Sequence, residues 1–307
     1  MNERNENMPR VNIAFLYGRV LKPPILVKDK DTGVYNYSMM YLDVVRGLRE
    51  VDDDVRYVRH DYPLVISRES ELIETIEDFK ENDIVLLKGT LSTKKIPKRS
   101  YCPNCTDEEG VATENTAYGN LVYITPIYIK KVAEFENKTD AIQHIVDNRE
   151  VSNQIYVAGT LLKDPKFFTT KQGVQIAQYP VAINRKFIIR TDDPSIRTDY
   201  PVVKSYGEQA RNDKAFLKYQ SEIIVDGFLQ ARRVTRKCKC KACGNIYAWK
   251  DNSMELVPYE VEYLLNYLTP EDVEEERKMK VEQYKQMLFT NGLKDDIDEE
   301  EQSDDLI

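Results

Sequence analysis

Tryptophan and histidine are scarce in this chain, which has one Trp and two His among 307 residues. Long apolar runs are missing as well. None reaches the roughly 20 residues that cross a bilayer, and the polar stretch 1–10 does not have the apolar centre of a signal peptide. We therefore expect a cytoplasmic protein without membrane contact. The five cysteines are an odd number, which argues against a disulfide framework in such a chain.

Motifs of catalysis are also missing. The sequence has no P-loop, no GxGxxG run, no nucleophile paired with a base and no pair of acids at a strand end. The two histidines, His60 and His144, do not stand at metal-ligand spacing from the cysteines. The sequence therefore predicts that the protein is not an enzyme.

Acidic charge is concentrated at one end of the chain. The net charge is −8, but residues 270–307 hold fourteen acidic and five basic residues, a net −9, so the other residues sum to +1. A block of like charge with few apolar residues favours disorder, and we expect a disordered acidic tail over 293–307. This tail either solubilises the protein, or docks partner proteins and competes with a polyanion for basic surfaces.

The sequence repeats itself. Asp61-Tyr62-Pro63 returns 138 positions later as Asp199-Tyr200-Pro201. Further matches, at offsets that fall from 141 to 138, are Asn12 with Asn153, Gly18 with Gly159, Gly33 with Gly173, Arg46 with Arg185, Gly89 with Gly227, and Cys102 and Cys105 with Cys240 and Cys243. An offset that persists over this length predicts two copies of one domain.

Each copy is predicted to be a small β-barrel. Alternating apolar residues at 11–20 and 153–162 indicate a first strand, and the glycine within it suggests a bulge or sharp bend. The complete order is strand, strand, strand, helix, strand, cysteine-bearing insertion, strand, which is the order of the OB-fold. We therefore predict an all-β protein with two tandem OB-folds. The expected segments are a disordered N-terminus (1–10), OB-fold 1 with a CxxC insertion (11–134), OB-fold 2 with a CxCxxC insertion (150–265), a helix (266–292) and the acidic tail (293–307).

Two runs in the second copy are distinctive: Ala182-Ile183-Asn184-Arg185 and Gly227-Phe228-Leu229-Gln230-Ala231-Arg232. With Asn153, Gly159 and Lys163-Asp164-Pro165 ahead of them, they make residues 150–235 resemble the bacterial single-stranded DNA-binding proteins. The resemblance implies sequence-tolerant binding and protection of single-stranded DNA in replication, recombination or repair, on a phage or mobile element for example. It also implies that replication or repair proteins bind the acidic tail.

Three features differ from that family. Two OB units stand in one chain, whereas the usual bacterial form has one per chain and assembles as a tetramer, so a monomer or a homodimer is implied here. The tail ends Asp304-Asp305-Leu306-Ile307 and lacks a terminal Pro-Phe. The cysteine-bearing insertions are not part of the common family.

Aromatic faces for bases and cations for phosphates are what sequence-tolerant single-strand binding requires. Even spacing places Tyr35, Tyr37 and Tyr41 on one face of a strand, although barrel core is the alternative for each tyrosine. The residues expected to bind nucleic acid are Arg19, Tyr35, Tyr37, Tyr41, Arg46, Lys163, Lys166, Phe168, Lys171, Tyr179, Arg185, Lys186, Arg232, Arg233 and Arg236. Two other functions remain open: an RNA-binding OB protein, and a zinc-knuckle scaffold for protein interactions.

The cysteine pairs have zinc-knuckle spacing. Two residues between thiolates allow a tight turn to direct both sulfurs at one tetrahedral ion, which suggests a structural Zn²⁺ at Cys102, Cys105, Cys240 and Cys243. Each pair supplies two ligands, so either the pairs meet across the copies in one four-thiolate site, or each is the remnant of a larger ribbon with Cys238 as a partial substitute. Reduced, metal-free cysteines are the third alternative.

Overall fold

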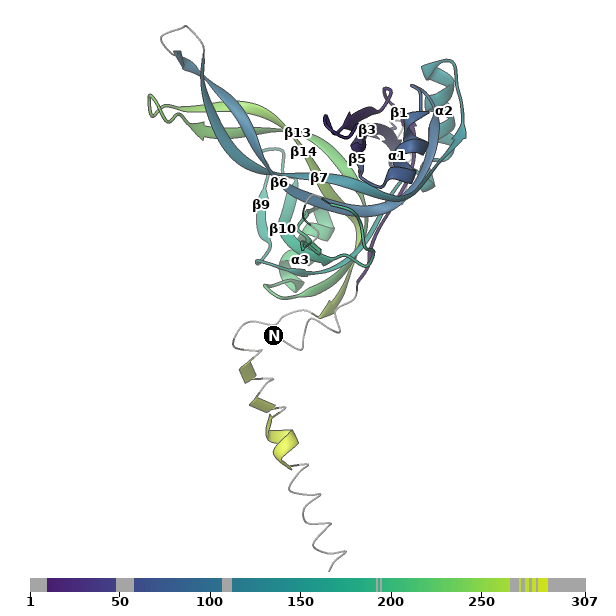
Figure 1. The fold of residues 1–307 in the computed structure, drawn as a ribbon. Coiled ribbons are helices and arrows are strands. Elements are labelled where there is room, and N and C mark those ends of the chain that lie inside the picture. The colour runs from purple at the N-terminus through teal and green to yellow at the C-terminus, as the bar shows by residue number, and fades with distance from the viewer. Residues whose placement is uncertain are drawn as a thin grey trace, which may run out of the picture.

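The computed structural model describes residues 10–47, 58–106 and 112–265 apart from 192 and 194, together with helical residues between 271 and 286. Figure 1 shows two strand-rich bodies side by side, from which a pair of long hairpins projects. Strands dominate and the described helices of both bodies are short, so the all-β class is confirmed. None of the described helices is long and apolar enough to cross a membrane. The tail predicted over 293–307 lies outside the described residues.

The first barrel is a closed ring of five strands. Its elements are β1 (Asn12–Val20), β2 (Ile25–Lys28), β3 (Tyr35–Val45), β4 (His60–Asp61), β5 (Leu64–Ser67), α1 (Ser70–Glu77), β6 (Ile84–Thr106) and β7 (Ala112–Ala133). β1 pairs with β3, β3 with β5, β5 in parallel with β7, β7 with β6, and β6 returns to β1. The helix α1 stands between the third and fourth strands of the ring, as the OB-fold requires.

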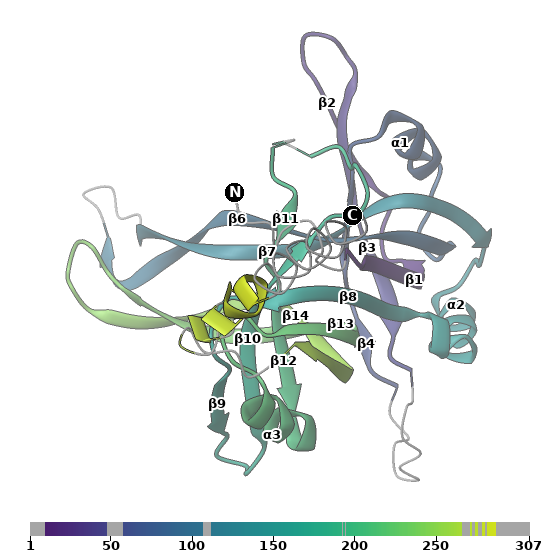
Figure 2. The same cartoon turned by 90° about the horizontal axis from the view of Figure 1, so that it is seen from below.

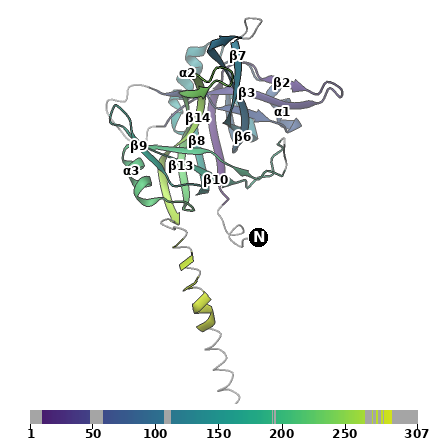
Figure 3. The same cartoon turned by 90° about the vertical axis from the view of Figure 1, so that its left-hand side faces the viewer.

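The second barrel repeats this ring strand for strand. Its elements are β8 (Asn153–Leu161), β9 (Lys166–Thr169), β10 (Gln175–Asn184), β11 (Thr198–Asp199), β12 (Val202–Tyr206), α3 (Gly207–Phe216), β13 (Glu222–Lys239) and β14 (Ile246–Leu265). The ring runs β8, β10, β12, β14, β13 and back to β8, and the β12–β14 pair is again the parallel one. The two copies therefore share one topology, and α1 and α3 lie on opposite sides of the molecule (Figures 2 and 3).

A helix that the sequence analysis did not predict connects the barrels. α2 (Lys138–Asp147) begins after Asn137, whose side chain caps the first turn, and a short 3₁₀ turn, η2 (Arg149–Val151), leads into β8. The buried face of α2 places Ala141 and Ile145 against Val45 and Ile84 of the first barrel. The connection is therefore a packed element of the first barrel.

The barrels join edge to edge through their first strands. β1 and β8 pair antiparallel, with Ala14 opposite Ile155 and Asn12 opposite Val157. Ala14 and Ile155 are equivalent positions of the two copies, so an approximate two-fold axis passes between them. The chain thus contains the geometry of a symmetric dimer within one polypeptide.

The first strand of each copy begins with a buried asparagine, whose side chain bonds the backbone of the fourth strand. The side chain of Asn12 donates to the carbonyl of Leu91 and accepts from its N–H, at 2.9 and 2.8 Å. Asn153 does the same with Leu229, at 2.9 and 3.0 Å. Each amide therefore ties β1 or β8 to the fourth strand of its own ring.

The sequence had suggested a bulge or a sharp bend at the mid-strand glycines, and the strand pairing excludes the bulge at Gly159. The pairing of β8 with β13 runs through Gly159 without a register shift. A Cβ at Gly159 would lie 2.4 Å from the carbonyl oxygen of Ala182 and 2.5 Å from Val181 Cγ1. The glycine is needed because the second strand of the ring crosses this closely over the first.

We expect Gly159→Ala to lower the free energy of unfolding by about 1–3 kcal/mol, the usual cost of overpacking a core. Gly47→Ala is the control, because the atoms nearest to a Cβ there belong to the side chain of Glu150, which is 61% exposed. It should change stability by less than about 0.5 kcal/mol. Urea denaturation of both variants checks this, and equal losses would contradict the reason given for Gly159.

The fourth and fifth strands are longer than expected. A cysteine-bearing insertion was predicted between the fourth and fifth strands, but β6 continues to Thr106 and β13 to Lys239 as paired ribbons with β7 and β14. The cysteine-bearing insertions are therefore continuations of the barrel strands. We call the described residues 94–106 and 112–120 arm 1, and residues 232–252 arm 2.

Candidate nucleic-acid interface and metal centre

The predicted tyrosine row lies on the outer side of β3. Tyr41 is 52% exposed, whereas Tyr35 and Tyr37 are half-buried. The ammonium of Lys28 stands 4.3 Å from the centroid of the Tyr35 ring, and the guanidinium of Arg68 stands 5.5 Å from that of Tyr37. Aromatic rings and cations are thus interleaved on one face of the first barrel, the combination that stacks bases and neutralises phosphates.

The second barrel presents its expected residues on the β9–β10 hairpin. Phe168 is 37% exposed. The exposed cations of this hairpin and its flanks are Lys163, Lys166, Lys171 and Lys186. The structure therefore leaves these five predicted side chains accessible to a ligand.

The structure contradicts the nucleic-acid-binding roles predicted for Tyr179 and Arg19. Tyr179 is fully buried and donates to Asp213 at 2.8 Å; burial and that carboxylate raise the pKa of its hydroxyl well above the usual value. Arg19 is 2% exposed and donates to Asp43 and Asn82, both at 2.9 Å. Neither side chain presents a face to a nucleic acid, so both predictions were wrong.

Arg46 and Arg185 each form an ion pair with a buried aspartate. Arg46 binds Asp61 through two nitrogens, at 2.6 and 3.0 Å. Arg185 binds Asp199 in the same bidentate way, at 2.5 and 2.8 Å, and its side chain is 6% exposed. Both carboxylates are fully buried, so the two arginines neutralise buried acids. Contact of either guanidinium with a nucleic acid stays a prediction.

Those two aspartates also hold the barrels together. Asp61 of the first copy accepts a hydrogen bond from the backbone N–H of Ala231 in the second, at 2.8 Å. Asp199 of the second copy accepts from the N–H of Thr93 in the first, at 2.7 Å. Thr93 and Ala231 are equivalent positions, so the contact is reciprocal. The repeated Asp-Tyr-Pro motif thus forms a clasp between the copies.

The three predicted arginines of arm 2 have different surroundings. Arg232 is exposed and donates to the hydroxyl of Tyr206 at 3.0 Å. Arg233 is exposed. Arg236 binds Asp251 of the same arm at 2.6 Å. Arg232 and Arg233 therefore remain accessible, whereas Arg236 takes part in the contact between the arms.

Other exposed tyrosines were not predicted as binding residues. Tyr62 and Tyr200 occupy the same place in the two copies and are 43% and 45% exposed. Their recurrence in the Asp-Tyr-Pro motif was the available signal, but it had served only to detect the repeat. On arm 1, Tyr101 and Tyr118 are 55% and 69% exposed, and nothing in the sequence distinguished them from core tyrosines.

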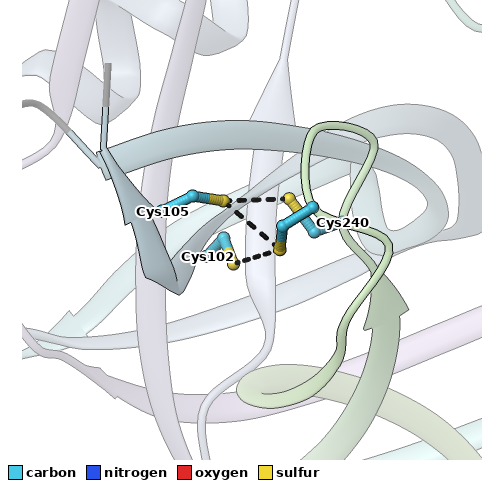
Figure 4. A group of neighbouring side chains, drawn as sticks. Cys102, Cys105 and Cys240 are labelled. Carbon is cyan, nitrogen blue, oxygen red and sulfur yellow. Dashed lines mark hydrogen bonds between the residues drawn. The ribbon is translucent and has the colours of Figure 1, made fainter. Parts of the chain in front are cut away.

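The arms contact each other along their inner faces. Lys98 of arm 1 binds both oxygens of Asp251 in arm 2 at 2.8 Å, and Ser100 lies 2.8 Å from the hydroxyl of Tyr247. Asn115 accepts a hydrogen bond from the backbone of Lys241 at 3.0 Å. These contacts bring the far ends of the two arms together, and the cysteines lie there (Figure 4).

The four knuckle cysteines form one cluster. The Sγ atoms of Cys102, Cys105, Cys240 and Cys243 all lie within 4.8 Å of one another. Cys105 is 3.3 Å from Cys240 and 3.5 Å from Cys243, and Cys102 is 3.8 Å from Cys243. Four thiolates at the Zn–S distance of about 2.3 Å stand roughly 3.8 Å apart in a tetrahedron. The donor set therefore fits one tetrahedral ion shared by the two copies.

Cys238 lies outside this cluster of four, and its Sγ donates to the carbonyl of Lys239 at 3.8 Å, so its suggested role as a partial substitute gains no support. The crowded thiols differ in acidity. The backbone N–H of Cys243 lowers the pKa of Cys240 to about 6, whereas the neighbouring thiols Cys102 and Cys240 raise the pKa of Cys105 to about 12. Four sulfurs this close cannot all ionise without a cation among them.

Comparison with known proteins adds to this geometry. Residues 152–242 match the model of the single-strand binding protein family. The second copy carries a domain of this family. Among curated relatives, Single-stranded DNA-binding protein 1 of Staphylococcus aureus strain MSSA476 is 32% identical over 85 residues, which are 28% of this chain and 53% of the relative. Single-stranded DNA-binding protein 1 of strain COL is 34% identical over 80 residues, 26% of this chain and 47% of the relative. The chain spans about half the length of the curated relatives it matches.

A solved structure extends the likeness of fold over both copies. The single-stranded DNA-binding protein from Thermus aquaticus, a deletion mutant with an R190A change, superposes with a TM-score of 0.52 at 16% identity. The match covers 85% of this chain and 98% of that one. At this identity the comparison establishes the fold alone, and it includes the first copy, which the single-strand binding family model does not match.

Proposed function

We propose that this protein binds single-stranded DNA without strong sequence preference and protects it during replication, recombination or repair, without catalysing a reaction. The observation that carries the proposal is the interleaving of exposed aromatic rings and cations on both barrels. Tyr41 with Tyr35 and Tyr37 on β3, and Phe168 among lysines on the β9–β10 hairpin, supply the two components that single-strand binding needs. The single-strand binding domain at 152–242 supports it.

Binding to oligo-dT is expected to exceed binding to duplex DNA and to weaken steeply between 50 and 200 mM salt. Tyr41→Ala and Phe168→Ala should each weaken dT binding about 5- to 150-fold, the effect of losing one stacking contact. Fluorescence anisotropy with labelled dT, rU and duplex oligonucleotides measures this.

Tyr284→Ala is the matched control, because Tyr284 is 60% exposed but lies in the helical segment outside both barrels. It should leave the dT affinity unchanged. Tightest binding to rU would favour an RNA-binding protein. Weak binding to all three oligonucleotides would favour a scaffold for protein interactions. Either result would reject the proposal.

We also propose that the cluster of Cys102, Cys105, Cys240 and Cys243 holds one structural Zn²⁺ per chain. Two thiolates from each arm, with sulfur separations close to those of a tetrahedral site, support this choice of ion. The ion would fasten the arms to each other. The number of zinc ions per purified chain tests it.

Two further assignments rest on the resemblance to the family. We propose that residues 293–307 dock replication or repair proteins, and that the chain forms a homodimer with four barrels. Pull-down of such proteins with the full chain, compared with a chain ending at 292, tests the first. The mass in solution tests the second.

A further inference from the structure

The arms present two outer faces that the duplication has made unlike. Side chains alternate along paired strands, so the residues between the inner contacts point away from the other arm. At matched positions, Tyr101 of arm 1 corresponds to Lys239 of arm 2, and Tyr118 corresponds to Lys250. The two faces therefore differ in chemistry although they share one fold.

Arm 1 has an aromatic outer face. Tyr101 and Tyr118 are more than half exposed, and the ammonium of Lys95 stands 5.1 Å from the centroid of the Tyr118 ring. Arg99 pairs with Glu114 at 3.5 Å. This face resembles the aromatic and cationic surfaces of the two barrels.

Arm 2 has a cationic outer face. Its outward residues, exposed throughout, are Arg233, Thr235, Lys237, Lys239, Ile246, Ala248, Lys250 and Asn252. Four are cations, and the set includes no acid and no aromatic ring. The acid of this arm, Asp251, points to the inner face, where it binds Lys98 and Arg236. The four outward cations are therefore left to repel one another or to bind an anion.

A surface with cations but no aromatic rings matches the chemistry of the phosphate backbone on the outside of duplex DNA. Single strands expose bases that stack on aromatic side chains. In a duplex the bases are stacked inside, and the phosphate backbone is the part that a sequence-independent protein neutralises. We propose that the outer face of arm 2 binds the phosphate backbone of duplex DNA, so that the protein recognises junctions between single-stranded and duplex DNA.

The placement of the arms allows both DNA forms to be held at once. The inner faces contact each other through the cysteine cluster and the Lys98–Asp251 pair, so the two outer faces point in opposite directions. Both arms project beyond the barrels (Figure 1). A single strand on the barrels and a duplex along arm 2 would not compete for one surface. The inference rests on the proposed single-strand binding for half of the junction.

The test compares a labelled dT oligonucleotide with the same oligonucleotide joined to a short duplex. The full-length protein should bind the tailed duplex about tenfold more tightly than dT alone. The double variant Lys237→Glu/Lys239→Glu should abolish this gain while dT affinity stays within about twofold. The slope of log K against log salt for the tailed duplex should fall by roughly 2, the loss of two phosphate contacts.

Lys214→Glu/Lys218→Glu is the matched control, because it makes the same change of charge at exposed positions on or next to α3. It should keep the gain. Since Lys239 adjoins Cys240, a second variant, Lys237→Glu/Lys250→Glu, repeats the test without the residue next to that cysteine and should also abolish the gain. A wild-type protein that binds the tailed duplex no better than dT would overturn the inference without affecting single-strand binding. So would arm 2 variants that lose dT and junction affinity equally.

Discussion

Asp199→Ala is expected to lower the free energy of unfolding by about 3–5 kcal/mol, the cost of leaving a buried charge without its partner. The carboxylate is fully buried and binds Arg185 through both oxygens. It also accepts the backbone N–H of Thr93 from the other barrel. Its loss would leave the Arg185 guanidinium, which is 6% exposed, without its counter-ion. It would also leave the backbone N–H of Thr93 without its acceptor. Few single substitutions in this chain should cost more.

The two-fold arrangement makes the same prediction for the other copy. Asp61→Ala removes the bidentate partner of Arg46 and the acceptor of the Ala231 N–H, so a similar loss is expected. Arg46 is somewhat more exposed than Arg185, at 15% against 6% of the side chain. The loss should therefore be the smaller of the two, because water reaches the stranded guanidinium more readily.

Urea denaturation measures both losses. Asp193→Ala is the control, because Asp193 is exposed and its side chain accepts hydrogen bonds from Ser195 within its own turn; it should cost no more than about 1 kcal/mol. In a double-mutant cycle, Asp199→Ala with Arg185→Ala should cost less than the sum of the single changes, since no unpaired charge remains. A loss at Asp199 no larger than at Asp193 would show that the clasp contributes nothing.

The strand order was predictable because the repeat doubled the evidence for it. The alternation within each first strand, and the helix between the third and fourth strands, recur in both copies, and the pairings confirm the resulting rings. The length of the arms was not predictable. Their inner faces mix polar side chains such as Lys98, Ser100 and Asp251 with the apolar cluster around Tyr247, so no continuous apolar alternation marked them as strands.

The sequence predicted least well which charged or aromatic side chains are buried and which are exposed. Arg46 and Arg185 follow the end of an apolar strand and look like surface cations in the sequence. Their partners, Asp61 and Asp199, lie fourteen or fifteen residues further on in the chain. Tyr179 is buried because Asp213, on α3, satisfies its hydroxyl. A buried ion pair or hydrogen bond of this kind depends on contacts distant in sequence, which periodicity does not report.

The cysteine cluster shows what geometry adds to spacing. Spacing allowed either one site shared by two knuckles or two separate remnants. The approximate two-fold axis through the β1–β8 pair brings equivalent points of the copies together, and the arms carry both knuckles to one place. The closeness of the four sulfurs, all within 4.8 Å of one another, favours the alternative that uses all four equivalent cysteines, and Cys238 has no counterpart in the first copy.

Zinc removal is therefore expected to separate the arms while both barrels stay folded. Protein purified without chelator should contain about one zinc ion per chain. Cys105→Ser/Cys240→Ser should contain none, because it removes one thiolate from each arm. Trp249 is the single tryptophan of the chain and packs beside the cluster, so its fluorescence should change when a chelator removes the ion. The affinity of the four thiolates for zinc should fall as the pH falls, since protons compete with the ion for the sulfurs.

Besides the cysteines, the arms contact each other through apolar packing of Tyr247 and Trp249 and through polar pairs. Lys98 with Asp251 and Ser100 with Tyr247 are polar pairs, and pairs of this kind contribute about 1 kcal/mol each, whereas zinc bound by four thiolates contributes on the order of ten. Cys238→Ser is the control, since that thiol stands outside the cluster, and it should keep its zinc and its fluorescence. Tyr41 lies on the barrel and not on an arm, so the zinc-free protein should still bind oligo-dT but lose its preference for a tailed duplex. Fresh protein without zinc, or a Cys238 variant that loses it, would refute the assignment of the four ligands.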